Sequence, residues 1–195
     1  MLSPQSQLLE RNIELFQADG GCLINPADAY FTDVLSEQPL HIVHQFFDIF
    51  TESVRVVPSA TFDSRDVAAS GFNLEQRVGQ HLHWFTPFIP AEKSFNFIVI
   101  YLPKAKAHFQ MLLEMAAAAL NKNGNIFVVG ENKGGIKSAA KLMQPLGNVT
   151  KVDSARHCSL LCLTPSSDHT FNSEKWLEEA QYDVLGSQWQ GVSMP

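Results

Sequence analysis

The sequence lacks the features that would place a protein in a membrane or in an oxidising compartment. It has only three cysteines, an odd number that is too small for a disulfide framework and indicates a reduced, cytoplasmic protein. It has no apolar run of the roughly 18 residues that a membrane-spanning helix needs, so no membrane partner is expected. Its first residues combine neither a basic region nor an apolar core, and therefore predict no signal peptide.

The motifs of several enzyme classes are also missing. There is no Gly-x-Ser-x-Gly elbow, no convincing carboxylate pair, no Walker sequence and no dinucleotide fingerprint. His81 and His83 share one face of a predicted strand, but no matched Cys or His pair accompanies them, which favours a structural role over a metal site. Cys158 and Cys162 also lie on a predicted strand and are expected to be small buried hydrophobes. The residues themselves predict no catalytic, cofactor or metal site.

What the sequence does contain is an α/β pattern in its second half. An apolar run at 95–101, a helical stripe and a second apolar run at 125–129 predict two adjacent parallel strands joined by a helix. A glycine-rich loop at 130–135 and another helix follow. Further strands are predicted at 22–24, 41–44, 53–57, 81–85 and 158–163, with the last one ending the sheet. The 195 residues and 45% apolar content suit one domain.

Positive charge is concentrated in the same part of the chain. The net charge of −6 argues against a general nucleic-acid binder, yet residues 104–157 carry 8 basic and 3 acidic side chains. Lys104 and Lys133 follow two parallel strands, so they are predicted to lie at one edge of the sheet. Lys133, Lys137 and Lys141 are spaced by four, beside a helix start at which Gly134-Gly135 exposes backbone amides. This predicts a phosphate-contacting surface. A merely solvated helix face remains an equal alternative.

Four segments of the chain resemble a known protein family. They are Tyr101-Leu102-Pro103-Lys104-Ala105-Lys106, Ile126 to Asn132, Gly135 to Ala139, and Lys151 to Cys158. They resemble the bacterial ribosomal RNA small-subunit methyltransferase C family, whose members methylate the N2 of a guanine in 16S ribosomal RNA with S-adenosylmethionine. Members of that family have two tandem methyltransferase-like domains, of which the N-terminal one is degenerate and the C-terminal one catalytic.

The resemblance implies that this chain is the N-terminal copy. The implied fold is a degenerate Rossmann-like class I methyltransferase fold, with a mixed, mostly parallel sheet flanked by helices. The implied domain covers 1–185, and 186–195 begins a linker to a missing C-terminal catalytic domain. The loop Asn25-Pro26-Ala27-Asp28 has no cofactor-binding glycine, and Tyr101-Leu102-Pro103-Lys104 replaces the Asn-Pro-Pro-aromatic motif of the working domain. The parent protein is thus an enzyme, and this chain alone is predicted to be inactive.

The resemblance also implies partners. No cofactor is expected in this chain, and S-adenosylmethionine is expected in the missing domain. The chain is expected to assist binding of 16S rRNA, assembled in the small ribosomal subunit, and to help its own C-terminal catalytic domain fold. The predicted RNA-backbone contacts are Lys104, Lys106, Lys133, Lys137 and Arg156. The alternative is a purely structural or dimerisation module without RNA contact. A self-sufficient methyltransferase is the least favoured interpretation.

Overall fold

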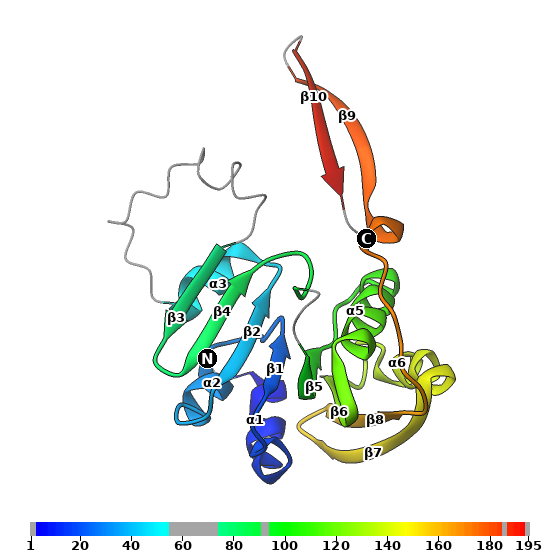
Figure 1. Ribbon diagram of the computed structural model, residues 1–195. Coiled ribbons are helices and arrows are strands. Elements are labelled where there is room, and N and C mark those ends of the chain that lie inside the picture. The colour runs from blue at the N-terminus through cyan, green and yellow to red at the C-terminus, as the bar shows by residue number, and fades with distance from the viewer. Residues whose placement is uncertain (1–2, 55–73, 91–93, 185–186, 194–195) are drawn as a thin grey trace.

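Eight strands of the described chain form one sheet, with helices on both of its faces (Figure 1). The computed structural model describes residues 3–54, 74–90, 94–184 and 187–193. The strands lie in the order β3-β4-β2-β1-β5-β6-β8-β7. In chain order they are β1 (Gly21–Ile24), β2 (Leu40–His44), β3 (Leu74–Val78), β4 (His81–Phe85), β5 (Phe95–Tyr101), β6 (Leu120–Glu131), β7 (Gly147–Ala155) and β8 (Cys158–Pro165).

The helices are divided between the two faces of the sheet. One face carries α1 (Pro4–Glu10), α2 (Tyr30–Val34) and α3 (Phe47–Val54), together with the 3-10 turn η1 (Ile13–Phe16). The other carries α5 (Lys106–Ala118), α6 (Ile136–Met143) and the 3-10 turn η2 (Gln144–Leu146). Within β5, Phe97 and Val99 face α1 and α2, whereas Ile98 faces α5 and α6. Because both faces of the central strands are buried, these strands are continuous apolar runs.

The pairing confirms the predicted mixed, mostly parallel sheet. Strands β4, β2, β1, β5 and β6 are parallel to one another, whereas β3 is antiparallel to β4, and β8 is antiparallel to both β6 and β7. Strands β5 and β6 are adjacent and parallel, as their sequences predicted, with Val99 opposite Phe127. The carboxyl ends of these five strands, and that of β7, therefore lie at one edge of the sheet, the carboxyl edge.

Two strand predictions were wrong. Strand β8 does not end the sheet but lies between β6 and β7, and the edge strand β7 was not predicted. Most of the side chains of β7 are exposed or half-buried, so its sequence lacks the apolar signal of a central strand. The strand predicted at 53–57 is also wrong for its first two residues, because residues 53 and 54 belong to α3. Its residues 55–57, and the segment from 58 to 73, lie outside the described residues.

Two helices end before the helical spacing of their apolar residues does. Ile13 and Phe16 continue the spacing of Leu9 beyond α1, and Leu120 continues that of Leu112 and Ala116 beyond α5. The first stops at Glu10, and the Asn12 side chain donates hydrogen bonds to the Leu8 carbonyl at 2.8 Å and to Asp153 at 2.9 Å. Such side-chain bonds compete with helix continuation. Helix α5 ends at Ala118, and β6 begins at Leu120 instead of 125.

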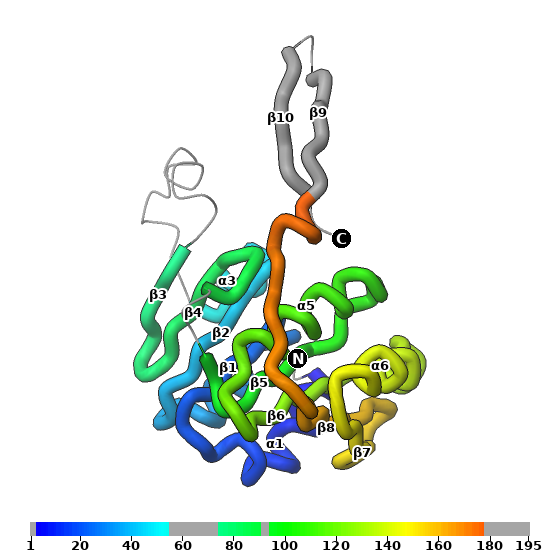
Figure 2. Tube along the Cα trace, turned by 45° about the vertical axis from the view of Figure 1, so that its right-hand side comes forward, coloured from blue at the N-terminus to red at the C-terminus, as the bar shows by residue number. Residues whose placement is uncertain are grey.

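The segment after β8 crosses the face that α5 covers (Figure 2). It includes the 3-10 turn η3 (Ser173–Trp176). Lys175 pairs with Glu114 of α5 at 3.1 Å, and the ring of Phe171 lies 5.4 Å from that of Phe88. Beyond it, β9 (Glu178–Val184) and β10 (Ser187–Ser193) pair as an antiparallel hairpin, in the region where a linker was predicted to begin. In the described part of the chain, no helix is long and apolar enough to cross a membrane.

Candidate functional site

The sheet reverses its strand order at β1, and this defines a crevice. From β1 the chain builds outward through β2 to β4, then returns to place β5 on the other side of β1. In open α/β sheets, ligands bind at such a reversal, beside the carboxyl ends of the two central strands. In this chain the crevice is bounded by the loop after Ile24 of β1 and by Tyr101 at the end of β5.

Side chains of the protein itself occupy this crevice. The Ser6 hydroxyl, from α1, donates to Asp28 at 2.7 Å and lies 3.0 Å from the Tyr101 hydroxyl. Asp28 also accepts from the backbone N–H of Ser3 at 2.6 Å and from that of Tyr30 at 3.2 Å. Because Ser6 gives its only proton to Asp28, Tyr101 must donate to Ser6. We call Ser6, Asp28 and Tyr101 the crevice triad.

Burial sets the protonation of this triad. Tyr101 is 5% exposed, and burial raises the pKa of its hydroxyl above the ordinary value, with the nearby Asp28 charge acting in the same direction. The tyrosine is therefore a neutral donor at physiological pH. Each hydroxyl has its partner within the triad, so the arrangement is a closed internal network.

A second network links the neighbouring strand ends. The Gln45 side chain, just after β2, donates to the Pro87 carbonyl at 2.8 Å and accepts from Asn25 at 2.7 Å. His108, in the first turn of α5, lies with its Nε2 atom 2.6 Å from the same Gln45 oxygen. Because that oxygen can only accept, Nε2 carries the proton. Segments after β1, β2 and β4 are thus tied to α5 by side chains.

The loop after β1 serves these internal contacts. Asn25 adopts a left-handed backbone conformation with φ 52° and is buried. The buried Pro26 after it has no N–H to offer a ligand. The loop therefore presents side chains to its own fold, whereas a glycine-rich loop would present backbone amides to a bound phosphate or nucleoside.

The five predicted RNA-contact residues lie on elements that meet at the carboxyl edge, and all five are exposed. Lys104 and Lys106 follow β5, Lys133 lies between β6 and α6, Lys137 is in the first turn of α6, and Arg156 is in the β7–β8 turn. The Asn132 N–H donates to the His157 carbonyl at 2.7 Å, which brings the neighbours Lys133 and Arg156 together. In the described part of the chain, no ion pair joins these five to a carboxylate.

The backbone on both sides of that hydrogen bond is unusual. Gly135 has φ 100° and opens α6, as its sequence predicted, although Lys133 precedes the helix and only Lys137 and Lys141 lie on it. Arg156 and His157 have φ values of 50° and 63°, the left-handed pair that a tight β-hairpin turn requires. Glycine and asparagine favour that conformation, so placing Arg156 and His157 there has a conformational cost.

The predicted structural role of the histidines is consistent with their geometry. His81 and His83 face the same side of β4, and both are buried. His83 stacks on His44 of β2 with a 3.0 Å contact between ring nitrogens, and His81 lies 2.8 Å from the Thr32 carbonyl. Burial, followed by the neighbouring histidine, lowers the pKa of His44 to about 3 and that of His83 to about 4. Within the described residues, no group of three His, Cys, Asp or Glu side chains is placed to hold a metal.

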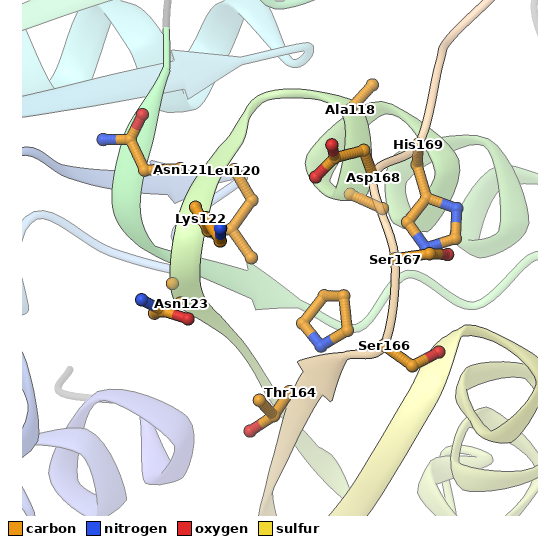
Figure 3. Close-up of a pocket in the computed structure, with 13 residues that line it drawn as sticks. Ala118, Leu120, Asn121, Lys122, Asn123, Thr164, Ser166, Ser167, Asp168 and His169 are labelled. Carbon is orange, nitrogen blue, oxygen red and sulfur yellow. The ribbon is translucent and has the colours of Figure 1, made fainter.

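The cysteines and the cavity of Figure 3 lie apart from the crevice. Cys158 is buried, as the strand pattern predicted, whereas Cys162 is only half-buried, and both thiols are free. The cavity of about 330 Å³ lies at the opposite, amino edge, between the start of β6 and the segment after β8 (Figure 3). Its labelled polar residues include Lys122, Ser166 and His169.

The crevice triad and the Gln45 network were not predicted as a unit. Asp28 and Tyr101 were noted only as departures from a working methyltransferase, and Ser6, Gln45 and His108 were not noted. The sequence did offer one signal: an apolar strand is followed at once by Asn25 and, three residues later, by Asp28. Polar side chains next to the end of a buried strand need hydrogen-bond partners.

The strand order and the reversal at β1 define a Rossmann-like methyltransferase fold. Solved methyltransferases share it, including the 16S rRNA N2 G1207 methyltransferase of T. thermophilus, in complex with AdoMet and guanosine. That structure matches with a TM-score of 0.65 and 17% identity over 99% of this chain and 47% of its own. A family model described as methyltransferase small domain N-terminal matches residues 6–180, and the chain belongs to that family.

Sequence relatives agree with this family. The ribosomal RNA small subunit methyltransferase C of Alteromonas mediterranea is 58% identical over all of this chain and 54% of the relative. The protein of that name in Pseudoalteromonas atlantica is 39% identical over all of this chain and 52% of the relative. The family resemblance seen in the four segments is therefore confirmed. The chain spans about half the length of these relatives.

Proposed function

We propose that this chain is the non-catalytic N-terminal domain of an S-adenosylmethionine-dependent 16S rRNA guanine-N2 methyltransferase. In this proposal 1–185 form the domain and 186–195 lead to a catalytic half that holds the cofactor. The domain assists RNA binding and the folding of that half. The names of the full-length relatives support the reaction class, and the T. thermophilus relative is described with AdoMet and guanosine bound.

The crevice triad is the observation that carries the non-catalytic role. Ser6, Asp28 and Tyr101 hydrogen-bond one another where a Rossmann-like sheet would contact its ligand. The loop before Asp28 offers no glycine and includes Pro26. These residues do not fit S-adenosylmethionine, and we derive no chemical step through it in this chain. In this proposal the domain contributes by binding RNA and by supporting the catalytic half.

The RNA-binding part of the proposal depends on the carboxyl edge. Five exposed cations converge there from β5, β6, α5, α6 and the β7–β8 turn, unneutralised by ion pairs within the described residues. Phosphate contacts of this kind give affinity and position without reading sequence. Arg156 adopts a left-handed conformation that is costly for a residue other than glycine or asparagine, and this supports a role for its side chain.

Reversing two of these charges should weaken RNA binding. We expect K133E/K137E to raise the Kd for a 16S rRNA fragment about tenfold, and to reduce the slope of log Kd against log salt by about 1.4, because each lost contact with single-stranded RNA removes about 0.7. The matched control is K122E/K151E, which changes the same charge at exposed lysines away from this edge. Filter binding at several salt concentrations is the measurement. Equal Kd values and slopes for both variants would contradict RNA binding by this edge.

A further inference from the structure

Two exposed phenylalanine rings lie at the carboxyl edge. Phe46 is 50% exposed and Phe47 46% exposed, more than any other large apolar side chain in the described residues. They follow the carboxyl end of β2, at the start of α3. Burying these rings would be favourable by the hydrophobic effect, so their exposure indicates a binding site.

Both rings pack against other aromatic side chains. The Phe47 ring lies 5.3 Å from Phe85 and 6.3 Å from Phe50, which itself packs against the buried His44. The Phe46 ring lies 6.4 Å from His108, and His108 is fixed by Gln45. Phe46 is therefore supported through His108 by the Gln45 network, and Phe47 is supported by the rings of Phe50 and Phe85. A supported ring loses little conformational freedom when a ligand stacks on it.

Charge around the rings is asymmetric. Lys106 is the first residue of α5, two positions before His108, and Lys104 lies two positions before Lys106. On the other side Asp48, which follows Phe47, is exposed, and Glu52 lies one helical turn further on. A phosphate would be attracted to the α5 side and repelled from the α3 side. A neutral aromatic group has no such restriction and can lie over the rings.

The apolar area is small and surrounded by polar groups. Gln45 and Asp48 flank the two rings in the sequence, and Lys106 lies two residues before His108, whose ring is near Phe46. The other exposed large apolar residues lie on η1, β3 and β7 and just after η3, not on α3 (Leu15, Val78, Val152 and Leu177). A stable protein interface buries about 800 Å² on each partner, with an apolar centre. Two rings beside two cations suit a nucleobase and its phosphate better.

We propose that Phe46 and Phe47 form a platform on which an unpaired RNA base stacks, with its phosphate toward Lys104 and Lys106. This inference rests on the proposed RNA-binding function and adds the recognition of single-stranded RNA. Base–aromatic stacking is tolerant of sequence, because every base has a flat face. The platform accordingly selects unpaired over paired RNA and does not select a base.

The test measures binding of the 195-residue chain to a short unstructured oligoadenylate. F46A and F47A should each raise the Kd about fivefold, near the lower end of stacking contributions, with the salt slope unchanged. F46W should keep the affinity, and RNA should quench its added indole emission relative to the parent. Because F47A removes packing against Phe85 and Phe50, folding is checked by circular dichroism, and F46W does not depend on that check. The control is L15A, which trims an exposed apolar side chain of η1 on the α1 face.

The outcomes separate the two proposals. If K133E/K137E weakens binding but F46A and F47A match L15A, and F46W is not quenched, the platform is wrong while RNA binding stands. If none of the variants changes RNA affinity, the RNA-binding function itself fails. If F46A changes self-association in sedimentation and leaves the RNA Kd unaltered, the rings serve a protein interface, and the platform is likewise overturned.

Discussion

Acidification from pH 7 to about 4.5 should lower the free energy of unfolding by about 5 kcal/mol through two buried histidines. His44 is 1% exposed and His83 2% exposed, and burial lowers their pKa values to about 3 and about 4. In the unfolded chain both should titrate near 6.5. Below that pH the unfolded chain binds more protons than the folded one, so stability falls as pH falls. The stabilisation is complete above about 6.5 and is lost toward the folded pKa values.

Urea unfolding across this pH range measures the effect. The variant H44Q/H83Q removes both imidazoles while keeping side chains that can hydrogen-bond each other, so its stability should depend less on pH by about 2 kcal/mol or more per pH unit. The control H157Q removes an exposed histidine of the β7–β8 turn and should keep the pH dependence of the parent. If H44Q/H83Q retains the parent's pH dependence, the buried pair is not its source.

Removing Asp28 should destabilise the domain by about 2–3 kcal/mol. Its carboxylate accepts from the Ser6 hydroxyl and from the Ser3 and Tyr30 N–H groups. Ser6 and Tyr101 are both buried, so D28A removes the acceptor of one of the two hydroxyl protons that this pair shares with Asp28. A buried donor that loses its partner costs roughly 1–3 kcal/mol, and bonds to a charged group lie at the upper end.

The control for D28A is D33A, which removes an exposed carboxylate from the same short helical region. We expect D33A to change the free energy of unfolding by no more than about 0.5 kcal/mol. A loss in D28A no larger than that in D33A would show that the triad contributes little. Y101F provides an intermediate case, because it deletes one hydroxyl and leaves Ser6 bound to Asp28.

The sequence predicted best the central strands, which are buried on both faces of the sheet. Strands β5 and β6 were found with the correct direction and adjacency because their apolar runs are continuous and flank a clear helical stripe. Strand β7 was missed because an edge strand buries little. The sequence gives no helix prediction for the Phe-rich residues 46–50, since Phe47 and Phe50 are positioned by packing against Phe85, which is distant in the sequence.

The candidate site was predictable only in its charged part. Lys104 and Lys133 follow recognisable strands, so their shared edge could be inferred from topology. The crevice triad joins Ser6, Asp28 and Tyr101, which are up to 95 positions apart. No local pattern links a helix serine to a strand-end tyrosine, and only the assembled sheet brings them into hydrogen-bonding distance.

Titration calorimetry with S-adenosylmethionine tests the central claim most directly. The account predicts no saturable heat for this chain, because its own side chains occupy the crevice and the loop after β1 offers no glycine. A full-length protein that includes the proposed catalytic half is the positive control and should bind the cofactor. Saturable binding to the 195-residue chain, abolished by a bulky substitution such as S6W, would contradict the non-catalytic assignment.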